Sequence, residues 1–266
     1  MMLRIPDPYD FELSTERLRA FGSDLANPFH EGALYRVLAG AEVRIAPVPG
    51  GVEVEPCDPK IGPLVERLLG LEFDLASFAD WAAGEPVLAP IVARLRGLRP
   101  LLVPDPFESL VISITAQQVS LRSALAMRNR LTARFGERWV HAYAFPRRER
   151  LAAAREDELV ALGFSRRKAE CVIGLARAEV DLGSLAFAAD EEVRQALVAF
   201  RGLGPWSAEW FLARHLARPR AWPAGDLVLR KAADLFYRTE VRELGRRLDP
   251  FQNLSAHYLL SAFRIP

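Results

Sequence analysis

A glycine-containing turn between two helical patterns is the feature that most restricts how this chain can fold. The segment VRQALVAFRGLGPWSAEWFLAR carries apolar residues at helical spacing on both sides of RGLGP. Gly202 and Gly204 permit backbone angles that are closed to other residues, and Pro205 and the cap-forming Ser207 complete a tight turn. The pattern therefore predicts helix, turn, helix. The free amides of the second helix would favour an anion such as a phosphate, although such a turn is also a common connector.

The charge of the chain is unevenly distributed. Residues 1–100 hold 10 Lys and Arg against 15 Asp and Glu, whereas residues 101–266 hold 25 against 19. Nearly all of the cations are Arg, which binds phosphate in a bidentate manner. The C-terminal two-thirds would therefore suit nucleic acid, and a GC-rich genome would explain the arginines equally well.

Several classes of protein are excluded by composition. Two cysteines, Cys57 and Cys171, and four scattered histidines form no metal-ligand pattern, no iron–sulfur motif and no disulfide framework. We therefore expect no cofactor. No apolar run reaches the roughly 18 residues of a membrane span, and the N-terminus resembles no signal peptide. The expectation is a soluble, cytoplasmic protein, associated with the nucleoid if prokaryotic.

The chain changes character near residue 80. Alternation at Val43 and Ile45, and again at Val52 and Val54, with PVPGG between them, predicts an antiparallel hairpin or meander. Helical patterns at 14–25 and 60–70 flank it, so the first 80 residues are predicted to be α+β. From about residue 85 the strand signal disappears, and eight or more short helices are expected. One long helical pattern, 105–136, is softly broken around Gln117 and Ser120, and Ser165 is expected to cap another helix.

Four ordered motifs resemble those of one enzyme superfamily. LVISITAQQVSLRSA, LGFSRRKAECVIGLA, GLGPWSAEWFLAR and PAGDLVLRKA are similar to the helix-hairpin-helix DNA glycosylases. Within these, the pattern most resembles the alkylpurine enzymes of the 3-methyladenine DNA glycosylase II type. The resemblance implies an α+β domain at 1–80, a helical subdomain carrying the hairpin at 106–218, and a second helical subdomain formed by 81–105 and 219–266.

Asp226 matches the essential carboxylate of that superfamily. Loss of a base leaves positive charge on the sugar, as in other glycoside cleavage, and a fixed carboxylate stabilises it. The same group could instead orient or deprotonate the attacking water, and the sequence leaves these roles open. Taken alone, Asp226 is also a good N-cap for the helix that follows PAGD.

The two tryptophans of the motif suggest a base pocket. Trp206 stands where bifunctional members of the superfamily carry a Lys that forms a Schiff base, so the resemblance implies a monofunctional enzyme. Trp206 and Trp210 would be aromatic walls for a cationic alkylated base. Their spacing alone equally fits a hydrophobic stripe. Near the C-terminus the resemblance places Leu260 in the pocket, or Tyr258 in a shifted register, where relatives carry another aromatic.

DNA contacts are implied for the hairpin and for one turn. The amides of Gly202, Leu203 and Gly204, with Ser207, would hold the DNA backbone, and a monovalent cation could bridge hairpin and phosphate. Gln118 stands where the family inserts a side chain into the gap left by the flipped nucleotide. That wedge is apolar in the alkylpurine branch, so Gln118 is a partial departure, and a polar cap in the bend is an alternative.

The resemblance therefore implies a monomeric glycosylase that acts on damaged double-stranded DNA, without membrane or obligate protein partner. It would flip and excise alkylated purines of the 3-methyladenine and 7-methylguanine class. Three alternatives remain open at this point. They are a helix-hairpin-helix glycosylase for deaminated or other damaged bases, a DNA-binding module without catalysis, and a purely structural helical protein.

Overall fold

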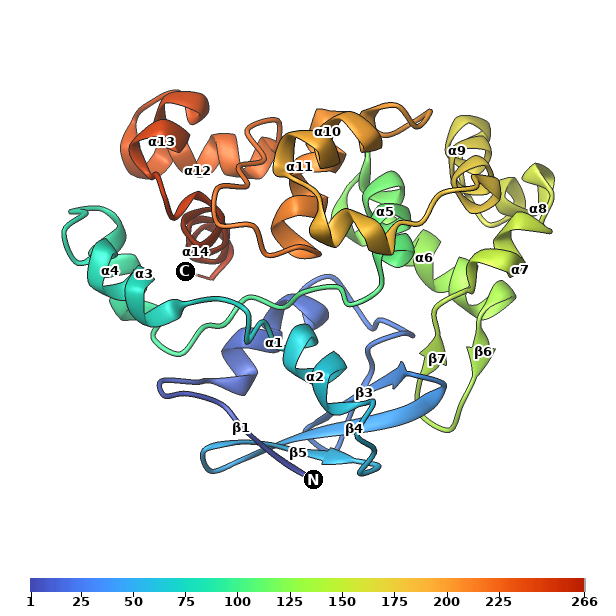
Figure 1. Ribbon diagram of the computed structural model, residues 1–266, viewed down its shortest axis with the longest axis horizontal. Helices are drawn as coiled ribbons and strands as arrows, with labels where there is room; N and C mark the ends of the chain where they lie inside the picture. The colour runs from blue at the N-terminus through green and yellow to red at the C-terminus, as the bar shows by residue number, and fades with distance from the viewer. Residues whose placement is uncertain (266) are drawn as a thin grey trace.

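The computed structural model describes residues 1–265. A small antiparallel sheet lies at one end of the molecule, two helices cover the face of the sheet that points inward, and a larger layer of helices lies beyond them (Figure 1). This arrangement confirms the predicted fold class, a small α+β unit followed by a helical core.

The sheet has five strands in the order β1-β5-β4-β3-β2, and every neighbouring pair is antiparallel. The central meander runs as predicted, because Val43 and Ile45 on one strand and Val52 and Val54 on the next are fully buried. The five strands of the sheet are β1 (Met2–Arg4), β2 (Phe29–His30), β3 (Ala33–Leu38), β4 (Ala41–Val48) and β5 (Gly51–Glu55).

The core of this unit lies between the sheet and its two helices, α1 (Phe11–Arg19) and α2 (Gly62–Leu68). Phe11 and Val65 from the helices join Ile45 and Val54 from the strands in one cluster of buried side chains. The helix α1 begins three residues before the predicted 14–25, because the Asp10 carboxylate accepts a hydrogen bond from the Leu13 amide at 2.9 Å.

The remaining helices share one continuous hydrophobic core that extends from Phe73 to Ala262. The break predicted around Gln117 and Ser120 separates α5 from α6, and Ser165 caps α9, as expected. The helices are α3 (Leu75–Ala82), α4 (Leu88–Arg94), α5 (Pro106–Ala116), α6 (Leu121–Phe135), α7 (Arg148–Ala152), α8 (Glu156–Ala161), α9 (Arg166–Arg177), the 3₁₀ helix η1 (Gly183–Phe187), α10 (Asp190–Val198), α11 (Pro205–Arg214), α12 (Leu227–Tyr237), α13 (Val241–Arg247) and α14 (Gln252–Arg264).

One short hairpin was not predicted in the helical region. The strands β6 (Glu137–Arg138) and β7 (Tyr143–Ala144) pair with each other and extend toward the sheet (Figure 1). Their loop is held by distant groups: the Glu42 carboxylate accepts from the amides of His141 and Ala142, at 2.8 and 2.7 Å. Because these contacts are tertiary, no alternation in the sequence marks the hairpin.

Two of the ion pairs between the α+β unit and the helical layer reach α5 and α14. A buried ion pair links Arg36 on β3 to Glu108 on α5. Glu16 on α1 pairs with Arg264 on α14 at 2.8 Å. The second contact brings α1 against the last helix of the chain.

Within residues 1–265, no helix combines the length and the apolar character that a membrane span requires.

Candidate active site

The glycine turn joins α10 to α11 as predicted, but its details differ from the prediction. Gly202 has a φ of 90° and needs glycine, whereas Gly204 has an ordinary φ of −129°. A Cβ on Gly202 would lie 2.1 Å from the Sγ of Cys171, so the turn rests directly on α9. The cap of α11 is Gly204, and the prediction that Ser207 caps this helix is wrong.

Two of the residues assigned to DNA contact are buried. Ser207 is 1% exposed and lies inside the first turn of α11, and Leu203 is 6% exposed. Their side chains pack inward, so neither presents a side chain to a ligand. Gly202 and Gly204 are partly exposed, and the exposed residues of the turn are Arg201 and Pro205.

The turn between α5 and α6 lies against the glycine turn. The side-chain amide of Gln117 donates to the Gly202 carbonyl at 2.8 Å and lies 3.3 Å from the Ser207 hydroxyl. Gln118, the next residue, is exposed and has a φ of 54°. Val119 beside it is 40% exposed. The structure therefore places the predicted wedge residue at the tip of a turn that Gln117, a residue without a predicted role, fastens to the hairpin.

Asp226 lies at the centre of the candidate site and accepts hydrogen bonds from two helices. Its Oδ1 accepts from the amides of Val228 and Leu229 at 2.9 and 3.0 Å, so Asp226 is the N-cap of α12. Its Oδ2 accepts from the indole N–H groups of Trp206 and Trp210 at 3.3 and 3.2 Å. Four N–H donors therefore surround one carboxylate, an arrangement that suits an acceptor-only anion.

The tryptophans reach Asp226 because they lie four residues apart on α11, where side chains share a face. Trp206 is partly exposed and its Cβ lies 3.6 Å from the position of a Cβ on Gly225. Trp210 is only 5% exposed. The Arg214 guanidinium lies 3.5 Å from the centroid of its ring, and His257 packs against it edge to face. Trp210 is therefore packed by neighbouring side chains, and its place as a wall of the base pocket stays a prediction.

The two candidates on α14 point to different sides of the helix, because residues two apart are separated by about 200°. Tyr258 is 4% exposed, donates its hydroxyl to the Leu98 carbonyl at 2.8 Å and packs on Phe78. Tyr258 is thus packed in the core, and its assignment to the pocket stays a prediction. Leu260 is also buried, at 8% exposure. Its place in the pocket stays a prediction.

The sequence did not indicate a group of three arginines, two of which, Arg17 and Arg214, feel the charge of Asp226. Arg17 comes from α1, Arg214 from α11 and Arg264 from α14. Burial, followed by the positive charge of Arg264, lowers the pKa of Arg17 to about 10, and the charge of Asp226 opposes that shift. Burial and the same cations hold the pKa of Arg214 and of His257 well below their usual ranges. At neutral pH, Arg17 is therefore protonated and His257 is neutral.

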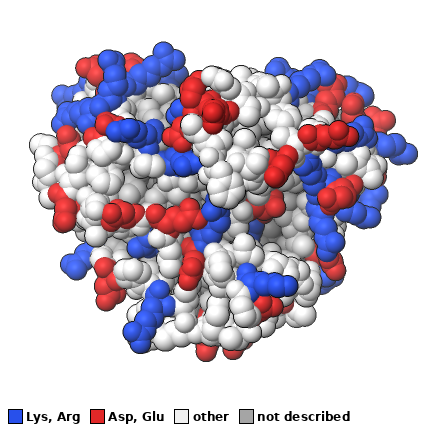
Figure 2. Space-filling model, viewed as in Figure 1, with Lys and Arg blue, Asp and Glu red and all other residues white. Residues whose placement is uncertain are grey.

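The outer surface carries both signs of charge. In Figure 2, Lys and Arg gather over α12 and α13 at the upper left and along α6 to α9 at the right, while Asp and Glu lie between them over α10. The exposed Arg201 of the glycine turn pairs with Glu170 at 2.8 Å. The face shown is therefore patchy rather than uniformly basic.

The class of protein follows from three features: the glycine hairpin, the turn that Gln117 bonds to it, and the carboxylate of Asp226 that caps α12. The chain belongs to the HhH-GPD superfamily of base excision DNA repair proteins, whose family model matches residues 111–247. This range contains the hairpin, Gln118 and Asp226.

Three individual proteins are similar to the chain. It is 30% identical over 173 residues to a DNA-3-methyladenine glycosylase of Bacillus subtilis, with 62% of this chain and 57% of that protein covered. It is 34% identical over 160 residues to DNA-3-methyladenine glycosylase 2 of Escherichia coli, with 56% and 54% covered. The solved 3-methyladenine DNA-glycosylase of Archaeoglobus fulgidus is 26% identical, with a TM-score of 0.91 and coverage of 100% of this chain and 99% of that one. The chain spans little more than half the length of the first two relatives.

Proposed function

We propose that the protein is a DNA glycosylase that flips alkylated purines out of double-stranded DNA and excises them, leaving an abasic site. The observation that carries the proposal is the carboxylate of Asp226, held by four N–H donors at the end of a helix-hairpin-helix unit. Similarity to three 3-methyladenine glycosylases supports the same substrate class.

The geometry favours one of the two roles open to Asp226. Each carboxylate oxygen has two in-plane lone pairs, and each already accepts two hydrogen bonds. A carboxylate so engaged is a poor acceptor for a proton from water. Asp226 would therefore act through its fixed negative charge, which stabilises the sugar cation as the bond to the base breaks. A water molecule then adds to the sugar carbon and releases its proton to solvent.

The enzyme would be monofunctional, because Trp206 occupies the place from which an amine would attack the sugar. An indole nitrogen donates a hydrogen bond but forms no Schiff base. Trp206 lies beside Asp226 and is partly exposed, so it would contact the extruded nucleotide.

DNA would be held at two adjacent turns. The partly exposed backbone at Gly202 and Gly204 leads into α11, where free amides favour a phosphate. Gln118 would enter the gap left by the flipped nucleotide. The hairpin cation, the monomeric state, the cytoplasmic location and the three-part division at residues 80, 105 and 218 belong to the same proposal.

A glycosylase for deaminated bases is the second candidate. The arginines near Asp226, Arg17 and Arg214, favour it because their side chains could donate hydrogen bonds to such a base. A DNA-binding module without catalysis is less well supported. A binder has no need for a carboxylate that four donors orient, and its negative charge would repel DNA.

The proposal is tested by incubating the protein with methylated duplex DNA and measuring free base and strand breaks separately. We expect 3-methyladenine and 7-methylguanine to be released, with strands cleaved only after alkali treatment. Strand cleavage without alkali would contradict the monofunctional mechanism. Tight binding with no released base would favour the DNA-binding module instead.

A further inference from the structure

The loop that carries Asp226 joins α11 to α12 and is held near its start by a glutamate. Glu209 lies on α11, one residue before Trp210, and its side chain is 17% accessible. One carboxylate oxygen, Oε1, accepts from the Nε of Arg194 on α10 at 2.6 Å. The other, Oε2, accepts from the backbone amide of Trp222 in the loop at 2.9 Å. We call Arg194, Glu209 and Trp222 the loop network, because they connect both helices of the hairpin to this loop.

Trp222 is also fixed by its side chain. Its indole N–H donates to the carbonyl of Val241 at the start of α13, at 2.8 Å. A Cβ on Gly245 of the same helix would lie 2.6 Å from the indole ring, so a larger residue at position 245 would displace the ring. Trp222 is therefore held by α11 through its amide and by α13 through its ring.

Between Trp222 and Asp226 the chain forms two tight turns. The amide of Ala224 donates to the carbonyl of Trp222 at 2.7 Å, and the amide of Asp226 donates to the carbonyl of Pro223 at 2.8 Å. Because the residues of this segment are bonded to one another, a displacement of Trp222 would move Asp226 with it. The position of the carboxylate thus depends on the contact between Trp222 and Glu209.

We propose that Glu209 is a positioning residue for Asp226, which holds the carboxylate at a fixed place relative to the hairpin. This inference rests on the proposed glycosylase function and adds a residue to its mechanism. The hairpin would hold the DNA backbone while Asp226 lies beside the sugar of the extruded nucleotide, so the two need a rigid connection. A misplacement of about 1 Å at a reacting centre can slow a reaction by about a hundredfold.

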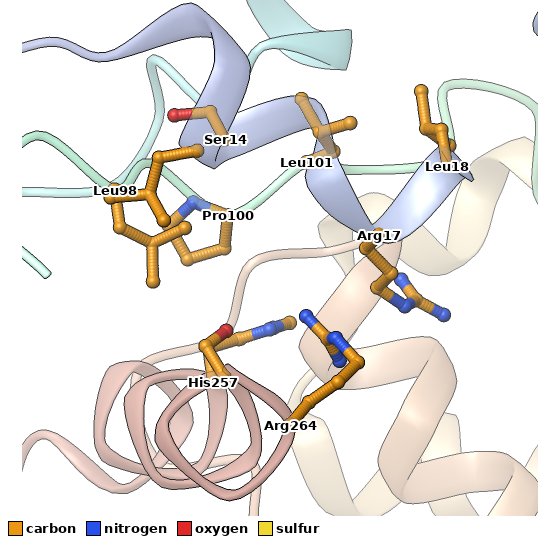
Figure 3. Close-up of a pocket in the computed structure, with 10 residues that line it drawn as sticks. Ser14, Arg17, Leu18, Leu98, Pro100, Leu101, His257 and Arg264 are labelled. Atoms are coloured by element: carbon orange, nitrogen blue, oxygen red, sulfur yellow. The ribbon is translucent and has the colours of Figure 1, made fainter. Parts of the chain in front are cut away.

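The loop network is separate from the cavity between α1 and α14. Figure 3 shows Arg17, Arg264 and His257 directed into that cavity. Among residues 1–265, those that line the cavity include no member of the loop network. A substitution of Glu209 therefore leaves the lining of the cavity intact, and its effect on excision can be assigned to the loop.

The test is a double-mutant cycle on single-turnover release of 7-methylguanine from duplex DNA. We expect Glu209→Ala to slow excision about tenfold or more, with unchanged affinity for a duplex that carries an abasic analogue. In the Asp226→Asn background the same substitution should slow excision no further, because the group that Glu209 positions is already lost. A residue that only supports the fold would lower both rates by the same factor.

Two further variants separate the hydrogen bond from a general effect of lost charge. Glu209→Gln keeps an oxygen that can accept from the Trp222 amide, so its rate should lie between those of the wild type and Glu209→Ala. Glu158→Ala is the matched control. Glu158 likewise accepts from one arginine and one backbone amide, those of Arg134 at 3.1 Å and Arg155 at 3.0 Å, but it lies on α8. Its rate should equal that of the wild type.

The other outcomes each overturn the inference. A wild-type rate for Glu209→Ala would show that the contact does not position Asp226, and equal slowing in both backgrounds would assign Glu209 to the fold. A rate for Glu209→Gln no faster than that for Glu209→Ala would remove the hydrogen bond as the cause. These results in an active wild type would leave the proposed function standing, whereas a wild type that releases no base would remove both. Should Glu209→Ala not fold, Glu209→Gln serves in the same cycle, with a smaller slowing that Asp226→Asn should again abolish.

Discussion

The two carboxylate oxygens of Asp226 have different partners. Oδ1 begins α12 by accepting two amides, and Oδ2 receives two indole N–H groups from α11. The capping interpretation and the catalytic interpretation of this residue are therefore compatible. The cap fixes the carboxylate, and a fixed charge stabilises a developing cation without reorganisation.

Trp210→Phe separates the hydrogen bond from the packing of the ring. Phenylalanine keeps an aromatic ring under Arg214 but removes the donor to Oδ2. A hydrogen bond to a charged group is worth about 1.5–3 kcal/mol, so we expect excision to slow by about tenfold or more with little change in DNA affinity. Single-turnover rates and binding to an abasic duplex measure the two effects. A wild-type rate would show that the indole N–H is dispensable.

At the scale of secondary-structure elements, the hairpin depends on α9. Gly202 combines a positive φ with the absence of a Cβ above Cys171, so both its conformation and its size matter. Gln117 then ties the same turn to the end of α5. Two elements distant in sequence, α9 and the end of α5, thus set the position of the partly exposed hairpin backbone.

Gly202→Ala should lower stability through a steric clash and a strained backbone. The added Cβ would lie 2.1 Å from the Cys171 sulfur, and we expect a loss of about 2 kcal/mol or more in the free energy of unfolding. Gly204→Ala is the matched control, because nothing lies within 4 Å of its Cβ position and its φ is −129°. Urea denaturation compares them, and equal stability of the two variants would contradict the account.

Local sequence signals predicted the elements of this fold well. The alternation at Val43 to Val54, the break at Gln117 to Ser120 and the cap at Ser165 all depend on near neighbours in the chain. The prediction that Ser207 caps α11 was wrong because Gly204 occupies the cap position. Ser207, three residues later, falls inside the helix.

Features created by tertiary contact could not be predicted in this way. Trp210 is covered by Arg214 from its own helix and by His257 from α14, and no pattern distinguishes such a ring from an open pocket wall. Arg17 reaches the site only because α1 packs against α14. The resemblance to the glycosylases located Asp226, whereas its two indole donors required the structure.

At the scale of the whole molecule, the α+β unit packs against the helices that carry the candidate site. Arg17 and Ser14 line the cavity from α1, and the ion pair between Arg36 and Glu108 fastens the sheet to α5. Both side chains of that pair are almost fully buried, at 7% and 5% exposure. Burial raises the pKa of Glu108, and Arg36 opposes the shift.

Glu108→Gln should destabilise the protein strongly, because it leaves the Arg36 guanidinium buried without a counter-charge. The expected loss is about 3 kcal/mol, typical of one partner removed from a buried pair. Asp157→Asn removes the anion of an exposed pair with Arg166, where the side chains are 79% and 68% accessible, and should cost less than about 1 kcal/mol. Thermal unfolding compares the stability of the two variants. Similar unfolding midpoints would mean that the buried pair does not fasten the α+β unit to the helical layer.

The central claim is that the fixed charge of Asp226 drives base excision. The most direct measurement is single-turnover release of 7-methylguanine by the wild type and Asp226→Asn, together with affinity for a duplex that carries a stable abasic analogue. Asparagine also caps helices well, so the fold should persist. We predict that excision falls by about a hundredfold or more while affinity is maintained. Release at the wild-type rate by Asp226→Asn would contradict the account and remove Asp226 from catalysis.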